Sequence, residues 1–408
     1  MTEDTRTTEG KQASAELAVV PDGVGLCARP VLVECPGCDT KTGEVCSEGH
    51  RHAVYVRCGT RRRSECASCA DLYAGDAYQL VNLGLEGDGS AGGGSSVRAA
   101  FVTLTAPGRQ EFGARHHFRD KRGARPCVCG EVHGPYDPVL GAPVEGDDFA
   151  YDKAAAWNEA IGPLWTAFAT YLRRAMPRGV RVEYARVSEP QRRGLFHLHA
   201  VVRFDGPWLS ARFIERAVKA AARAASYHDR FRFGRADVRV LGSPGVSAQE
   251  VSGYLAKYAT ASASDFWSKH GGVPATGPAR AHLDRLAAVA EARAARRMRA
   301  ALMARGVLSG LQPHEERRAK RIGQSLGFGG HAITKSRGYS TTFTALRARR
   351  RAWASAAAGN DGDDEMPVHF WRFVEVGWSL EHQAGWAAAA AAAHRASLAD
   401  RPPLVAAA

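Results

Sequence analysis

The alternation of apolar and polar residues predicts several β-strands in the middle of the chain. Phe101–Thr105 is a β-rich run that ends at a Pro-Gly turn signal. Residues 180–187 and 196–204 are two more strand-like runs, and the short polar turn between them contains Gly194. Because a short turn joins antiparallel neighbours, we expect these two runs to pair antiparallel. Residues 236–241 should form a further strand.

Helical patterns lie between these strands. Residues 151–175 carry four large apolar side chains on one face, namely Trp157, Trp165, Phe168 and Leu172. Residues 209–226 also have a helical pattern. Another helix should begin at the capping box Ser247–Glu250, with Val246 and Val251 in the positions of a hydrophobic staple. Helices interleaved around an antiparallel centre predict an α+β fold rather than a doubly wound parallel sheet.

The charge of the chain is strongly basic and unevenly spread. Its 408 residues include 55 Lys and Arg against 42 Asp and Glu, a formal charge of +13. Residues 291–354 hold 15 basic and 3 acidic side chains, a net +12, in Ala- and Arg-rich helical sequence. A solvated helix face would have the same composition, but the adjoining Gly327–Thr342 adds glycines, hydroxyls and aromatics suited to phosphate contact. We therefore expect a polyanionic partner, with DNA favoured.

Composition also suggests how the chain is divided. Seven of the nine cysteines fall within the first 70 residues, and a Gly/Ser-rich stretch at 87–96 follows as a linker. We expect four parts: a cysteine-rich module at 1–85, the α+β domain at 97–275, a basic helical region at 280–355 and an alanine-rich tail at 356–408. The first twenty residues are polar, and an apolar run of membrane-spanning length is not found. The prediction is a soluble, cytoplasmic protein with no membrane partner.

Two histidines form the first candidate site. His197 and His199 are two residues apart in a strand-like run, so their side chains point to the same face. Glu189 and Gln191 lie just before the turn, where pairing can bring one or both beside the histidines. Two imidazoles with a carboxylate or amide oxygen suit an open site for Mg²⁺ or Mn²⁺, since a closed zinc site needs a fourth protein ligand. Ordinary structural histidines are the alternative.

Two tyrosines form the second candidate feature. Tyr254 and Tyr258 are one helical turn apart with Lys257 between them, so both hydroxyls can address one site. The alternative is that they are core aromatics that continue the apolar positions Val251 and Leu255. A phenol near a cation or an ammonium group can attack a phosphodiester, and the resulting phosphotyrosine keeps the bond energy without a nucleotide cofactor.

The residues resemble a known superfamily. Glu189–His199 fits the pattern E-x-Q-x-R-G-x-x-H-x-H of the HUH endonucleases, and Tyr254–Tyr258 resembles their two-tyrosine helix. Phe101–Thr105 is similar to their first strand motif. Within the superfamily, Cys58–Cys69 and Thr334–Thr342 resemble actinobacterial plasmid rolling-circle replication initiators. The resemblance covers about residues 27–355 and leaves the tail unassigned.

The resemblance implies an antiparallel HUH nuclease core that nicks one strand of a plasmid's double-strand origin, leaving a 5′-phosphotyrosine and a free 3′ hydroxyl. His197 and His199 would bind the catalytic Mg²⁺ or Mn²⁺, with Glu189 or Gln191 as third ligand. Single-tyrosine relatives keep the tyrosine after the lysine, so Tyr258 would make the first cut and Tyr254 the terminating transfer. Lys257 would stabilise the phosphate. The chain has no G-x-x-x-x-G-K-[ST] phosphate loop, so we expect a host helicase as partner.

The cysteines predict structural zinc. Cys35–Cys38 and Cys66–Cys69 have zinc-knuckle spacing. The resemblance favours one site made of Cys27, Cys58, Cys66 and Cys69, with a second from Cys35, Cys38 and Cys46 plus His50 or His52. Cys127 and Cys129, with His133, either chelate a metal or are ordinary loop residues.

Two other functions fit parts of the sequence. A transposase or conjugative relaxase would share the nuclease chemistry and differ in its DNA. A non-enzymatic, zinc-containing DNA-binding regulator would account for the charge and the cysteines, but it leaves the spacing of the histidines and tyrosines as coincidence.

Overall fold

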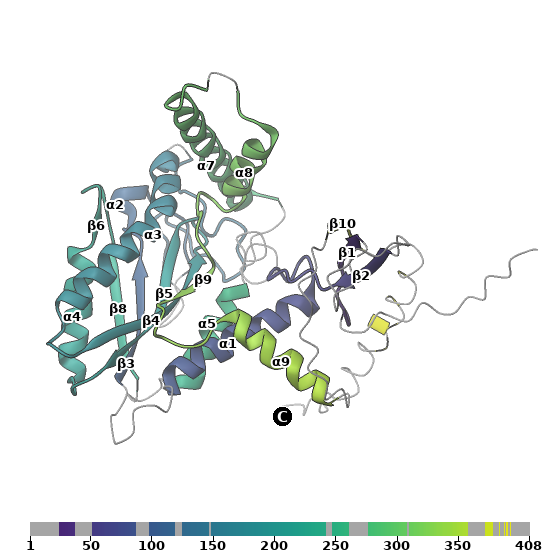
Figure 1. The fold of residues 1–408 in the computed structure, drawn as a ribbon. Coiled ribbons are helices and arrows are strands. Elements are labelled where there is room, and N and C mark those ends of the chain that lie inside the picture. The colour runs from purple at the N-terminus through teal and green to yellow at the C-terminus, as the bar shows by residue number, and fades with distance from the viewer. Residues whose placement is uncertain are drawn as a thin grey trace, which may run out of the picture. The chain divides into compact units, whose positions relative to one another are not determined.

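The computed structural model describes residues 24–36, 51–86, 98–118, 125–146, 148–241, 247–260, 276–307, 310–357 and 372–377, together with a few single residues near the C-terminus. They belong to two compact units (Figure 1). The first comprises Met1–Thr60, Ser64–Ala70 and Gly362–Ala408, and the second comprises Arg61–Arg63 and Asp71–Asp361. Each unit is described by itself.

The first unit contains a three-stranded antiparallel sheet. Its order is β10-β1-β2, from β10 (Arg372–Val376), β1 (Val31–Pro36) and β2 (Arg51–Val56). Val31 pairs with Val56 on one side and with Val376 on the other. Part of the segment expected to be a separate tail therefore completes the sheet of the cysteine-rich module.

The second unit is built on a five-stranded antiparallel sheet of order β8-β3-β5-β4-β9. The strands are β3 (Arg98–Thr105), β4 (Arg181–Pro190), β5 (Phe196–Asp205), β8 (Arg235–Val240) and β9 (Ile333–Lys335). The predicted antiparallel pair is confirmed as β4 and β5, and the mixed helix and antiparallel-sheet architecture is confirmed with it. A small hairpin, β6 (Ser226–Tyr227) with β7 (Phe231–Arg232), lies apart from this sheet.

Helices cover both faces of the sheet (Figure 1). One face packs on α3 (Tyr151–Arg174) and α4 (Ala211–Ala224), and the four apolar side chains predicted on α3 are all buried there. The other face packs on the part of α1 (Ala67–Glu86) that belongs to this unit and on α5 (Ala248–Thr260). Alternate residues of β5 enter the two cores: Leu198, Ala200 and Val202 the first, and Val201 the second.

The start of α5 is fixed by the predicted capping box. The backbone N–H of Ser247 donates to Glu250 Oε2 at 2.9 Å, and the backbone N–H of Glu250 donates to Ser247 Oγ at 3.1 Å. Val246, the other half of the expected staple, lies outside the described residues. The cap sets the register of the helix that carries the two tyrosines.

The basic region shares the core of this unit. It comprises α7 (Pro278–Met303), α8 (Pro313–Gln324) and α9 (Phe343–Ala357). The remaining described helix of the unit, the short α2 (Arg109–Phe112), lies outside the basic region and follows β3. Leu283, Leu286 and Ala290 of α7 are buried in the same cluster as α3 and β5. Helix α7 therefore supports the sheet as well as carrying charge.

The turn between β4 and β5 requires a glycine. Gly194 has a φ of +78°, and a Cβ there would lie 2.4 Å from Leu286 Cδ2 and 3.2 Å from Leu283 Cδ2. The buried side chain of Asn158 on α3 holds this turn, since its Nδ2 donates to Gly194 O at 2.9 Å and its Oδ1 accepts from the Phe196 N–H at 2.9 Å. The turn between β4 and β5 is therefore packed tightly against both α3 and α7.

We expect Gly194→Ala to lower the free energy of unfolding by about 1–3 kcal/mol, because it adds backbone strain and displaces two leucines of α7. Chemical denaturation measures this. Gly75→Ala is the matched control: a Cβ on this helical residue meets no atom within 4 Å, so stability should rise by about 0.5–1 kcal/mol. Equal stability of the Gly194 variant and the wild type would contradict the packing described here.

Candidate active site

The register of β4 and β5 brings a carboxylate beside the two histidines. Glu189 pairs with His197 and Val187 with His199. The Nε2 atoms of the two imidazoles are 3.0 Å apart, so the rings converge on one face of the sheet as their spacing predicts. Glu189 Oε2 lies 2.8 Å from His197 Nε2 and 2.6 Å from His199 Nε2. One oxygen and two nitrogens therefore meet at one point.

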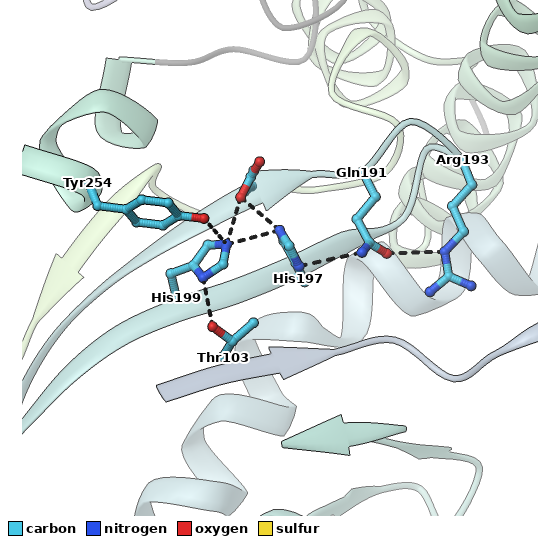
Figure 2. A network of polar contacts seen from close by, with 7 residues as sticks. Thr103, Gln191, Arg193, His197, His199 and Tyr254 are labelled. Carbon is cyan, nitrogen blue, oxygen red and sulfur yellow. Dashed lines mark hydrogen bonds and ion pairs between the residues drawn. The ribbon is translucent and has the colours of Figure 1, made fainter. Parts of the chain in front are cut away.

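Gln191, the other candidate for third ligand, lies behind His197. Its Nε2 is 3.5 Å from His197 Nδ1, the ring nitrogen turned away from Glu189 (Figure 2). Strand β4 ends at Pro190, so Gln191 belongs to the turn and not to the sheet face. Of the two candidates for third ligand, only Glu189 places an oxygen next to the Nε2 atoms of both histidines.

The charges of this cluster suit a cation. Burial alone would raise the pKa of the Glu189 carboxyl, but contacts with His197 and His199 lower the pKa to about 2. Burial lowers the pKa of His199, opposed by its contact with Glu189. At neutral pH the cluster thus offers an ionised carboxylate and a neutral buried imidazole, which are the states in which these groups bind metals.

Neighbouring side chains contact His199 and Gln191. Thr103 on β3 places its Oγ1 3.0 Å from His199 Nδ1, which leaves Nε2 facing Glu189. Arg193 Nε donates to Gln191 Oε1 at 3.1 Å (Figure 2). Its Nη1 donates to the carbonyl of Pro107 at 2.8 Å. Sequence reasoning assigned no role to Thr103 or Arg193, although both stand in the motifs that carry the resemblance.

We expect Thr103→Val to weaken binding of a divalent metal by the histidine cluster about 10–100-fold, because loss of the outer hydrogen-bond partner of a metal-binding histidine typically costs that much. A titration of the protein with Mn²⁺ measures the change. Thr105→Val, two residues along the same strand, serves as control and should behave like the wild type. If Thr103→Val requires no more metal than the control, the contact with His199 has no functional role.

The two tyrosines of α5 face the same cluster. Tyr254 Oη lies 3.3 Å from His199 Nε2, and its side chain is 37% exposed. The Tyr258 ring stacks near His199 with centroids 5.8 Å apart, and the two tyrosine rings are 4.7 Å apart. Burial, followed by the negative charge of Glu189, raises the pKa of both phenols above the usual range. Tyr254 is therefore an exposed residue at the cluster and not a core aromatic.

Lys257 lies on the solvent side of α5. Its Nζ is 5.6 Å from the centroid of the Tyr258 ring, and its side chain is exposed. An ammonium at this position adds positive charge beside the phenol.

A family model described as "RepSA: Replication initiator protein, pSAM2" matches residues 15–392. The chain belongs to this family of plasmid replication initiators. A replication initiator protein of Streptomyces ambofaciens is 36% identical over 341 residues, which cover 74% of this chain and 70% of that protein. No solved structure matches the chain.

The initiator has a cavity beside the histidine cluster. It measures about 710 Å³ and lies between β3, β8 and α5. Its lining includes His199, Tyr254, Phe101, Arg239 and Arg235, whose guanidinium is paired with Asp237 at 2.7 Å. Cationic and aromatic groups in one cavity are suited to the backbone and bases of a nucleic-acid strand.

The basic helices of the initiator use part of their charge internally. Arg293 Nη1 of α7 lies 2.6 Å from Asp152, and Arg297 pairs with Glu159, both carboxylates belonging to α3. A groove between α7 and α8 is lined by three exposed basic side chains, Arg299 of α7 and Arg317 and Lys320 of α8. The net charge of +12 for residues 291–354 therefore overstates the number of basic side chains that are available to bind a partner.

The initiator's first unit brings four cysteines together. These are the predicted set Cys27, Cys58, Cys66 and Cys69, whose Sγ atoms lie within 4.8 Å of one another. Backbone N–H groups point at two of the sulfurs: Ala28 N is 3.2 Å from Cys66 Sγ, and Cys58 N is 3.4 Å from Cys27 Sγ. The structure does not describe the side chains of the second expected zinc site, which are Cys35, Cys38, Cys46, His50 and His52.

In the parts of the initiator that the structure describes, no helix combines the length and the apolar character that crossing a membrane requires.

Proposed function

We propose that this replication initiator nicks one strand of its plasmid's double-strand origin by metal-dependent tyrosine transesterification. The observation that carries the proposal is the shared contact at His199: Glu189 Oε2 lies 2.6 Å from its Nε2, and Tyr254 Oη lies 3.3 Å from the same atom. A partly exposed phenol, which could act as nucleophile, therefore adjoins a largely buried set of atoms that could bind a metal. Membership of an initiator family favours this activity over that of a transposase or relaxase.

The ligating atoms fit a divalent metal. Glu189, His197 and His199 each offer one atom, and all three atoms lie within 4.8 Å of one another. We propose them as ligands of Mg²⁺ or Mn²⁺, with Gln191 orienting His197. Three protein ligands leave positions open for a phosphate oxygen. When bound, such a cation would polarise the scissile phosphate and favour the ionised form of a nearby phenol.

The chain's own residues would perform the strand transfer. A tyrosine phenol gives up its proton to solvent as its oxygen forms a bond to phosphorus. The bond from phosphorus to the 3′ oxygen breaks, and that oxygen takes up a proton from solvent to give a 3′ hydroxyl primer. The 5′ phosphate stays on the tyrosine, so the later transfer needs no energy source. Both phenols adjoin His199. We propose Tyr258 for the first cut and Tyr254 for the terminating transfer, with Lys257 stabilising the phosphate.

Origin DNA would be bound by the exposed cations. Arg239 lines the cavity beside Tyr254, where a single strand must lie to be cut, and Arg235 lies next to it but is paired with Asp237. Arg317 and Lys320 stand in the groove between α7 and α8 and would contact duplex phosphates. The first unit's four cysteines would hold a structural Zn²⁺. Strand separation beyond the nick would fall to a host helicase.

Affinity for origin duplex should fall steeply with salt, by about 10³–10⁵ between roughly 50 and 200 mM if 6–10 phosphates are neutralised. Arg317→Ala combined with Lys320→Ala should reduce the salt slope by about 2. The control is Arg280→Ala, whose guanidinium is paired with Asp284 at 2.9 Å and should leave the slope unchanged. A slope that is the same in all three proteins would remove α8 from the interface.

The adduct assay tests the proposed function. Purified protein is incubated with a single-stranded origin oligonucleotide labelled on its 3′ side and with Mg²⁺ or Mn²⁺, and the products are separated in SDS. We expect a labelled protein band, absent with EDTA, and peptide mapping should place the label on the tyrosine helix. An intact oligonucleotide without any adduct would favour a non-enzymatic DNA-binding regulator.

A further inference from the structure

A second cluster of metal-ligating side chains lies in the long loop between α2 and α3. Its members are His116, Cys127, Cys129 and His133, and their ligating atoms all lie within 4.8 Å of one another. His116 Nδ1 is 3.1 Å from His133 Nε2, and Cys129 Sγ is 3.2 Å from the same nitrogen. Both cysteines are free thiols, and Cys127 and His133 are buried.

The spacing matches a tetrahedral site. Zinc binds sulfur at about 2.3 Å and nitrogen at about 2.0–2.1 Å, so ligand atoms at the corners of a tetrahedron lie roughly 3.3–3.8 Å apart. The distances from His133 Nε2 to His116 Nδ1 and Cys129 Sγ are 3.1 and 3.2 Å, slightly shorter than these edges, and all four ligand atoms lie within 4.8 Å of one another. Two sulfurs and two imidazole nitrogens are a ligand set typical of structural zinc.

The loop also supplies the outer partner that zinc-binding histidines usually have. Asp137 Oδ2 lies 2.7 Å from His133 Nδ1, so Nε2 is left to face the other three ligands. Asp137 is itself held, because its Oδ1 accepts the N–H of Val139 at 3.0 Å. A carboxylate behind a histidine fixes the ring and strengthens it as a ligand.

Three large apolar side chains near the ligands are exposed and do not pack the loop. Val128, Val132 and Tyr136 stand among the ligands and are 49%, 54% and 83% exposed. A tight turn joins the cysteines, with Gly130 N donating to Cys127 O at 2.9 Å. A metal would supply the cross-link that these side chains do not.

We propose that His116, Cys127, Cys129 and His133 hold a structural Zn²⁺ that fixes this loop against the turn between β4 and β5. The loop touches that turn at two places. Both terminal nitrogens of Arg192 donate to the carbonyl of Pro135 at 3.3 Å. Gly141 approaches so closely that a Cβ on it would lie 2.4 Å from Arg192 O.

The turn leads directly to the histidine cluster. Arg192 is followed by Arg193 and preceded by Gln191, whose amide lies 3.5 Å from His197 Nδ1. Zinc in the loop would therefore keep Gln191 in place to orient His197. This consequence for nicking rests on the proposed function, whereas the zinc site stands on its own ligands.

Zinc content of the full-length protein tests the site. The doubly substituted Cys127→Ser, Cys129→Ser protein should contain one zinc fewer per chain than the wild type, measured by atomic emission after removal of loosely bound metal. Val132→Ser, a change at an exposed position beside His133, should keep the wild-type content. An equal zinc content in the double variant and the wild type would overturn the proposal.

A measurement on the unaltered protein covers the case in which the variant fails to fold. Alkylation followed by peptide mapping reports Cys129 separately from the cysteines of the first unit. We expect slow alkylation of Cys129 in the zinc-loaded protein and at least a tenfold faster reaction after chelation. The same rate with and without zinc would overturn the site.

The link to nicking has its own test. Arg192→Ala should keep the zinc but lower the rate of adduct formation, and the double cysteine variant should lower that rate at least as much. Wild-type rates in both variants would overturn the link and leave the zinc site intact. If the wild-type protein forms no adduct while the zinc measurements hold, the proposed nicking function fails and the zinc site does not.

Discussion

Tyr258→Phe is expected to abolish the first covalent adduct with origin DNA, lowering its rate of formation by roughly 10³-fold or more, as loss of a nucleophile does in covalent catalysis. The variant keeps the ring that stacks near His199, so the fold and the arrangement of Glu189, His197 and His199 should be unaffected. Gel separation in SDS with labelled oligonucleotide measures the adduct.

Tyr254→Phe is the matched comparison. This variant loses the hydroxyl that lies 3.3 Å from His199 Nε2 but retains Tyr258. We expect it to form the first adduct and to be defective in the second transfer, which is measured by joining of the cut strand to a new 3′ hydroxyl. If Tyr254→Phe loses the first adduct and Tyr258→Phe keeps it, the order of the two tyrosines is the reverse.

Replacing both His197 and His199 with Ala is expected to remove metal-dependent cleavage while sparing duplex binding. The two imidazoles supply two of the three converging atoms, and a single carboxylate is a weak site for Mg²⁺ or Mn²⁺. Duplex binding should persist because the exposed cations of α8 lie on another element. Cleavage and gel-shift assays on the same preparation measure the two activities, and unchanged cleavage would rule out the histidines as ligands.

Single substitutions at Glu189 and Gln191 test which of these residues is the third metal ligand. Glu189→Gln removes the charge but keeps the size, and it should weaken cleavage more than Gln191→Ala, for which we expect a loss of about 10–100-fold. The reason is position: Glu189 Oε2 faces both Nε2 atoms, whereas Gln191 contacts the far nitrogen of His197. A larger loss at Gln191 would make the amide the third ligand.

Local pattern predicted most elements of the second unit. The strands β3, β4, β5 and β8 and the helices α3, α4 and α5 lie within a few residues of their expected bounds. This succeeded because each of them has a strong periodicity or an explicit cap. The pairing of β1 with β10 was not foreseen, since strands from opposite ends of the chain share no local signal.

The sequence alone established the chemical content of the molecule: two imidazoles on one strand face, two phenols one helical turn apart, a basic segment and a cysteine-rich module. These follow from the period of 2 in strands and 3.6 in helices, which depend only on neighbours along the chain. Tertiary structure decided the rest. Register and the end of β4 at Pro190 brought Glu189 to the Nε2 atoms of both histidines and Gln191 only to the far nitrogen of His197. His116 joined Cys127 and Cys129 across the loop. Such contacts join residues distant along the chain, and packing of the whole unit selects them.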